Sequence, residues 1–138
     1  MKRMQQIAVQ VPNRYGTLAE ICHGLAESQV NIIAIMVPES GHSGIIRILP
    51  DNLEESERVL RELELPFTTE EVISLELTNQ PGELARISED LGIAQVGIDY
   101  LYATTDGDGR SERVILGVTD TDRAVELLQE RQPAASTA

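Results

Sequence analysis

The sequence predicts an α+β protein made of two tandem βαββαβ units, each a mainly antiparallel sheet with its helices on one face. The first observation is a repeat at an offset of 66 positions, because ten of the 26 positions from 7 to 32 are identical to their counterparts from 73 to 98. The second is that strand-like and helix-like apolar patterns follow one another in the same order in both copies. The chain is therefore a duplicated unit.

The first copy begins with residues 4–11, whose apolar and polar positions alternate as in a half-buried strand. Asn13 is expected to cap the next helix. That helix has a predicted apolar stripe of Leu18, Ile21, Cys22 and Leu25. Four further elements complete the copy: a strand over 31–37 buried on both faces, a strand over 45–49, a helix opening at 50–52 and a weak strand over 65–70.

The second copy repeats this order from residue 71, with a turn at 105–110 that is two residues longer than its counterpart. Residues 132–138 have no strand pattern, so we expect this copy to lack its last strand and to end in a flexible tail. The βαββαβ order is that of the ferredoxin-like fold. We expect domains at 1–70 and 71–131.

Composition narrows the classes of function. The 138 residues carry a formal net charge of −12, which disfavours binding to nucleic acids and anionic membranes. The sequence shows no signal segment and no apolar run of the ~20 residues that span a membrane, so we expect a cytoplasmic protein. The single cysteine excludes an internal disulfide.

The repeated Asn-x-x-Gly-x-Leu junction at Asn13–Leu18 and Asn79–Leu84 is the candidate site. It places the first turn of a helix after a central strand, where unpaired N–H groups and the helix dipole favour a carboxylate. The glycines allow close approach, and an Asn amide offers both a donor and an acceptor to an amino acid. The alternative is purely structural, with Asn as a helix cap and Gly as a packing residue.

The segment Asn79-Gln-Pro-Gly-Glu-Leu-Ala-Arg-Ile87, followed by Val96-Gly-Ile98, resembles the start of an ACT domain. The first copy resembles it at Asn13, Gly16, Leu18 and Val30-Asn-Ile32, with Tyr15 where proline is usual. The resemblance extends over about residues 4–130 and implies a stand-alone pair of ACT domains. It implies a regulatory protein that is not an enzyme and that binds an amino acid at ACT–ACT interfaces, through the loop after strand one and the facing second strand.

Carried onto this sequence, the resemblance implies these ligand-binding residues: Asn13, Arg14, Tyr15, Gly16, Thr17, Leu18, Asn31, Ile32, Asn79, Gln80, Pro81, Gly82, Glu83, Leu84, Gly97 and Ile98. The two copies differ within this set. Tyr15 is expected to fill part of the first site, Gly97 lacks the polar side chain of Asn31, and Arg14 can pair with a carboxylate whereas Gln80 cannot.

No other motif carries chemistry. Cys22 is expected in the core, His23 and His42 at the surface, and the Asp106–Gly109 segment in a turn without the rest of a calcium loop. We expect no metal and no cofactor. The leading hypothesis is an amino-acid-binding regulator, expected to be a homodimer, that changes either its own association or the activity of a partner enzyme when the ligand binds. The alternatives are an interaction module without ligand and, last, a small phosphohydrolase that uses Arg14.

Overall fold

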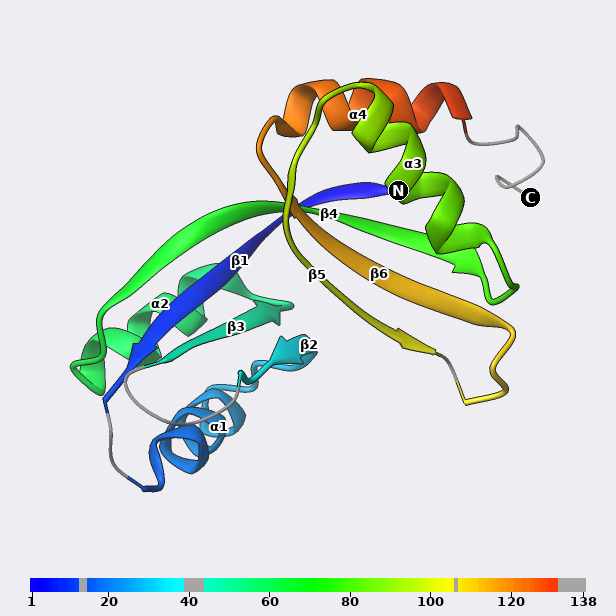
Figure 1. Cartoon of the computed structure of the whole chain (residues 1–138). Helices are drawn as coiled ribbons and strands as arrows, with labels where there is room; N and C mark the ends of the chain where they lie inside the picture. The colour runs from blue at the N-terminus through cyan, green and yellow to red at the C-terminus, as the bar shows by residue number, and fades with distance from the viewer. Residues whose placement is uncertain (13–14, 39–43, 106, 132–138) are drawn as a thin grey trace. The chain divides into compact units, whose positions relative to one another are not determined.

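The computed structural model describes residues 1–12, 15–38, 44–105 and 107–131 (Figure 1). Strands and helices follow one another in the predicted order, except that the strand expected over 65–70 and the first strand of the second copy form one continuous strand, β4. They are β1 (Lys2–Val11), α1 (Thr17–Glu27), β2 (Ile32–Met36), β3 (Gly44–Pro50), α2 (Leu53–Glu62), β4 (Phe67–Thr78), α3 (Glu83–Ile93), β5 (Ile98–Thr105), β6 (Ser111–Val118) and α4 (Thr121–Arg131). None of the helices in the described ranges is long and apolar enough to cross a membrane.

The chain divides into two compact units, one of Gln5–Glu70 and one of Met1–Met4 together with the residues from Glu71 onward. The strand order is β2-β3-β1-β4 in the first unit and β1-β4-β6-β5 in the second. The pairs β1–β3, β2–β3, β4–β6 and β5–β6 are antiparallel. The predicted α+β class with two ferredoxin-like units is confirmed.

The long strands β1 and β4 each contribute to both units. The described residues end with α4, and the predicted absence of a strand in 132–138 lies outside them. Met1–Met4 lie beside β4 in the second unit, at the place of the fourth strand of a ferredoxin-like unit. Met1 packs against the second core, and Arg3 donates to Glu71 at 2.9 Å and to Asp122. Hydrogen bonds to these carboxylates raise the pKa of Arg3. The expected first domain of 1–70 therefore differs from the first unit by the four residues that complete the second.

Each unit has an aliphatic core between its helices and one face of its sheet. In the first unit this core joins β1, β3, α1 and α2 through Ile7, Val9, Ile21, Leu25, Ile46, Ile48, Val59 and Leu60. In the second it joins β4, β6, α3 and α4 through Ile73, Leu75, Leu77, Ile87, Leu91, Val114, Leu116, Ala124 and Leu128. In each unit the described helices lie on the face of the sheet that forms this core, as predicted.

The buried stripe of α1 differs from the predicted one. Thr17, Ile21 and Leu25 are buried, whereas Leu18 is 38% exposed and Cys22 is half-buried. The helix turns its i, i+4, i+8 row to the core. The prediction was wrong at Leu18 and Cys22 because apolar content alone does not determine the rotation of a helix about its axis.

The second strand of the first copy also differs from its prediction. No residue of β2 is fully buried, although the strand was expected to be buried on both faces. The strand order explains this, because β3 lies between β1 and β2 and leaves β2 at the edge.

Strand registers reproduce the repeat in detail. Ile7 pairs with Ile48, and its counterpart Ile73 pairs with Leu116. The offset between equivalent residues of the two copies is therefore 66 in the first strand of the copy and 68 in the third. The two extra residues lie in the longer turn between β5 and β6. The register of β2 on β3 shifts between Ile32 and Ala34, and that of β5 on β6 shifts between the equivalent Ile98 and Tyr100.

Candidate functional site

Both helices at the candidate site begin after a glycine in the left-handed conformation. Gly16 has φ 89° before α1, Gly82 has φ 94° before α3, and neither helix has a side-chain cap in the part of the chain that is described. A Cβ at either glycine would meet no atom within 4 Å, so both loops are open on that side. Asn13 and Arg14 lie outside the described residues.

Asn79 is not a helix cap, the role expected for its counterpart Asn13 and considered as the structural alternative for both loops. Because α3 begins at Glu83, Asn79 stands too far ahead of the helix, and its Nδ2 donates instead to the carbonyl of Gly109 at 2.7 Å. Its backbone N–H donates to the carbonyl of Arg110 at 2.8 Å. The second loop is thus tied to the turn between β5 and β6, a role for Gly109 and Arg110 that sequence reasoning missed because it depends on backbone carbonyls.

The first turns of the two helices differ in polarity. Thr17 is 2% exposed, and its Oγ1 has no hydrogen-bond partner among the described residues. Its counterpart Glu83 is half-buried, and its carboxylate accepts from Arg86 at 3.1 Å. An acidic side chain complements the positive end of the helix dipole. It therefore also competes with a bound carboxylate, and the first loop is electrostatically the better site for an anionic group.

Tyr15 is fully exposed to solvent in this chain, and the expectation that it fills part of the first site stays a prediction. Gln80 and Pro81 are exposed in the second loop as well. Leu84, by contrast, packs against the second core and fixes the start of α3. The Asn-x-x-Gly-x-Leu pattern thus combines an exposed tip with one apolar anchor in the second copy.

The predicted strand residues Asn31, Ile32, Gly97 and Ile98 do not meet the loop of their own unit. Val11, which leads into the first loop, pairs with Gly44, whereas Ile32 pairs with Pro50. Gly44 and Pro50 are six residues apart along β3, which places the loop and the start of β2 about 20 Å apart at ~3.3 Å per residue. In the second unit Thr78 pairs with Ser111 and Ile98 with Val118, which gives a similar separation. One small ligand cannot contact both places in one unit.

The strand starts are held by matching hydrogen bonds from a backbone N–H to a side-chain oxygen. Asn31 N–H donates to Asp51 Oδ1 at 2.9 Å, and Gly97 N–H donates to Thr119 Oγ1 at 2.9 Å. A Cβ at Gly97 would lie 2.9 Å from Thr119 Cγ2. Glycine at this position therefore has a packing reason, and it does not by itself indicate a ligand.

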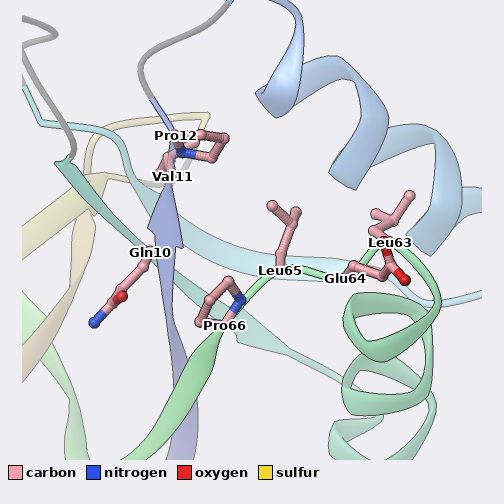
Figure 2. A pocket seen from close by; sticks show the side chains of 7 residues that line it. All are labelled: Gln10, Val11, Pro12, Leu63, Glu64, Leu65 and Pro66. Carbon is pink, nitrogen blue, oxygen red and sulfur yellow. The ribbon is translucent and has the colours of Figure 1, made fainter.

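A cavity of about 400 Å³ lies in the first unit near the end of β1. Figure 2 shows its lining, which is formed by Gln10, Val11, Pro12, Leu63, Glu64, Leu65 and Pro66. The lining is mostly aliphatic and contains one carboxylate and no basic group. It offers no positive charge to the carboxylate of an amino acid, and it includes neither of the two predicted loops.

The remaining candidates carry no chemistry of their own. His23 is exposed on α1, and His42 lies outside the described residues. Within the described ranges, no group of three or more His, Cys, Asp or Glu side chains could hold a metal ion.

Many solved structures share this fold, among them the following three. Protein BT0572 from Bacteroides thetaiotaomicron is 23% identical with a TM-score of 0.87, covering 94% of this chain and 88% of that one. The regulatory subunits of aspartate kinase from Thermus thermophilus and Thermus flavus are 16% and 17% identical, with TM-scores of 0.63 and 0.61. They cover 91% and 94% of this chain, and 90% and 92% of their own.

No curated protein matches the sequence. A family model described as an ACT domain pair matches residues 2–133, which include both loops, both strand starts and all four helices. The chain therefore belongs to the family of ACT domain pairs.

Proposed function

We propose that this ACT domain pair is a non-enzymatic, cytoplasmic regulator that binds a free amino acid at the loops before α1 and α3. The observation that carries the proposal is the shape of these loops: each helix starts after an exposed left-handed glycine without a side-chain cap. The first N–H groups of a helix have no partner within the helix. A carboxylate at such a place gains charge-assisted hydrogen bonds of about 1.5–3 kcal/mol each.

The separation of the loop from the strand start suggests how binding could regulate. A ligand that contacts a loop and also Asn31, or Gly97, has to bridge two ACT units, because these places are about 20 Å apart in one unit. Binding would then stabilise one assembly of ACT units by about 2.7 kcal/mol at a hundredfold excess of ligand over Kd. A partner enzyme could respond to that assembly. The shared fold of the aspartate kinase regulatory subunits supports the regulatory class.

The test is calorimetric titration of the full chain with each standard amino acid, alongside thermal unfolding. We expect at least one amino acid to bind and to raise Tm. Gly16→Ala and Gly82→Ala should each remove binding at one loop, because the added methyl occupies the open side of the glycine. The left-handed φ also costs alanine about 1 kcal/mol. Binding is therefore measured well below the Tm of each variant.

Gly92→Ala is the matched control. Gly92 lies near the end of α3, and a Cβ there meets no atom within 4 Å. Its binding should equal that of the wild type. If no amino acid binds the wild-type protein, the proposal fails and an interaction module without ligand takes its place.

A further inference from the structure

The cavity near the end of β1 has no part in the proposed amino-acid binding. It lies between Pro12, which follows β1, and the segment Leu63–Pro66, which joins α2 to β4 (Figure 2). Its volume of about 400 Å³ is in the range of small-molecule sites. All of its lining residues belong to the first unit. The cavity is therefore a second candidate site, and its chemistry can be read from its lining.

A proline explains why β1 and β4 part at this place. Gln10 N–H donates to the Pro66 carbonyl at 2.9 Å. Further back in β1, Gln6 donates to Glu70 at 3.3 Å, so the two strands run antiparallel. The two residues of such a pair exchange hydrogen bonds, but Pro66 has no N–H to return. The Gln10 carbonyl therefore keeps an acceptor position beside the cavity.

The next rung of the ladder is missing because it has no donor either. Pro12 would stand opposite Glu64, but Pro12 has no N–H, and Glu64 N–H already donates to the Arg61 carbonyl at 3.0 Å. The N–H groups of Leu63 and Leu65 donate to carbonyls of α2 at 3.0 and 3.1 Å. The segment that joins α2 to β4 thus offers no free backbone donor to the cavity.

The β1 side of the cavity is poor in donors as well. Neighbouring N–H groups along a strand point to opposite sides, so that of Val11 points to β3, where Val11 pairs with Gly44. Among the described lining residues, the one donor left is the side-chain amide of Gln10. Glu64 adds an exposed carboxylate, and no ion pair of the described residues involves it. The lining is therefore apolar and rich in acceptors.

We propose that this cavity binds a small alkylammonium ion, with its alkyl chain against Val11, Leu63 and Leu65 and its ammonium group toward the acceptors of Glu64 and Gln10. An ammonium group has donors and no acceptor, which complements this lining. The net charge of −12 adds attraction for a cation. Burial of the alkyl chain supplies most of the affinity, because an exposed ion pair contributes little. This ligand is a cation and not a zwitterion, so the inference goes beyond the proposed function.

The test is a titration of the full chain with pentylammonium chloride, followed through the backbone amide shifts in NMR spectra. Saturable shifts should be confined to Val11, Leu63–Leu65 and their neighbours. Pentanol keeps the alkyl chain without the charge and should bind about threefold more weakly, whereas pentanoate reverses the charge and should give no saturable shift there. Sodium chloride at matched concentrations corrects for ionic strength. No amino acid is present, so failure here leaves the proposed function untouched.

Two substitutions test the acceptors. Glu64→Gln should weaken binding about threefold, and Glu54→Gln, which removes the same charge from an exposed position of α2 outside the lining, should bind like the wild type. Pro66→Ala restores an N–H opposite the Gln10 carbonyl and should also weaken binding. Pro38→Ala, at an exposed proline outside the lining, should not.

The proposal has several ways to fail. Absence of saturable shifts with pentylammonium, shifts centred outside the cavity, or equal affinity for pentanol would each overturn it. So would equal affinities in Glu64→Gln and Glu54→Gln, or a folded Pro66→Ala that binds like the wild type.

Discussion

The same cross-strand position is filled in opposite ways in the two units. In the first unit Ala34 of β2 pairs with Leu49 of β3, and in the second Tyr100 of β5 pairs with Gly117 of β6. In the first unit the small residue is on the edge strand and the large one on its neighbour. In the second unit the large residue is on the edge strand and the small one on its neighbour. A Cβ at Gly117 would overlap the ring of Tyr100, with Cε2 at 2.6 Å.

This exchange indicates what the duplication has preserved. Neither residue of the pair is the same in the two copies, yet the strand register is the same. Because protein interiors are close-packed, the combined volume of a pair is constrained more strongly than either member. The two units are therefore best compared by pairs of residues.

Gly117→Leu should break this comparison most strongly. The leucine enters space held by the ring of Tyr100, and we expect a loss of about 3 kcal/mol in the free energy of unfolding, near the upper end for overpacking. Chemical denaturation of the full chain measures it.

The control is the double variant Tyr100→Ala with Gly117→Leu, which rebuilds the Ala34–Leu49 pair of the first unit. It should recover much of the loss, with a coupling of about 1–3 kcal/mol in the mutant cycle. If the stability losses of the two single variants simply added in the double variant, the side chains at positions 100 and 117 would not be energetically coupled.

The helix pairs give the second comparison. Gly24 of α1 lies against α2, where an added Cβ would be 2.7 Å from Val59 Cγ1, whereas the equivalent residue of α3 is the buried Asp90. Gly24→Ala should cost about 1–2 kcal/mol, because overpacking against a stiff valine exceeds the gain in helix propensity.

Gly92→Ala is the comparison for Gly24→Ala, because we expect it to raise the free energy of unfolding where Gly24→Ala lowers it. Gly92 has open space around it, so alanine gains about 0.5–1 kcal/mol of helix propensity without a clash. Thermal unfolding of both variants checks the pair of predictions. If both variants lost a similar amount of stability, close packing against Val59 would not be the reason for glycine at position 24.

The repeat and the apolar periodicity predicted the fold because both report directly on element order. They did not report strand order, so β2 was predicted to be buried when it lies at an edge. The role of Asn79 was also missed, since a left-handed Gly82, not the asparagine, defines where α3 begins. The ligand-binding residues stay a prediction, and the structure adds that loop and strand start are far apart in one unit.

Substitutions of Asn79 and Asn52 distinguish an effect on the second loop from a general loss of stability. Asn79→Ala removes the bond to Gly109, and Asn52→Ala removes the cap of α2, in which Oδ1 accepts from Glu55 N–H at 3.1 Å. Each should cost about 1 kcal/mol. If the second loop binds an amino acid, only Asn79→Ala should weaken its affinity, by about tenfold in titration calorimetry. Equal affinities in the two variants would show that the tie to the hairpin is structural only.

The smallest change in stability is expected for glycine substitutions at the ends of α1, α2 and α3. Each of these helices ends in a turn with a left-handed residue that is not glycine. Gln29, Glu64 and Gln95 have φ near 60°, and each lies in a helix-ending turn such as Leu65 N–H to Leu60 carbonyl at 3.1 Å. Glycine adopts this conformation without steric cost, but it also loses more backbone entropy on folding. The difference leaves a gain of about 0.5 kcal/mol for Glu64→Gly. Gln29→Gly and Gln95→Gly, at matching positions in the two copies, should gain the same amount in denaturant titrations, and unequal gains would show that the units differ at their helix ends too.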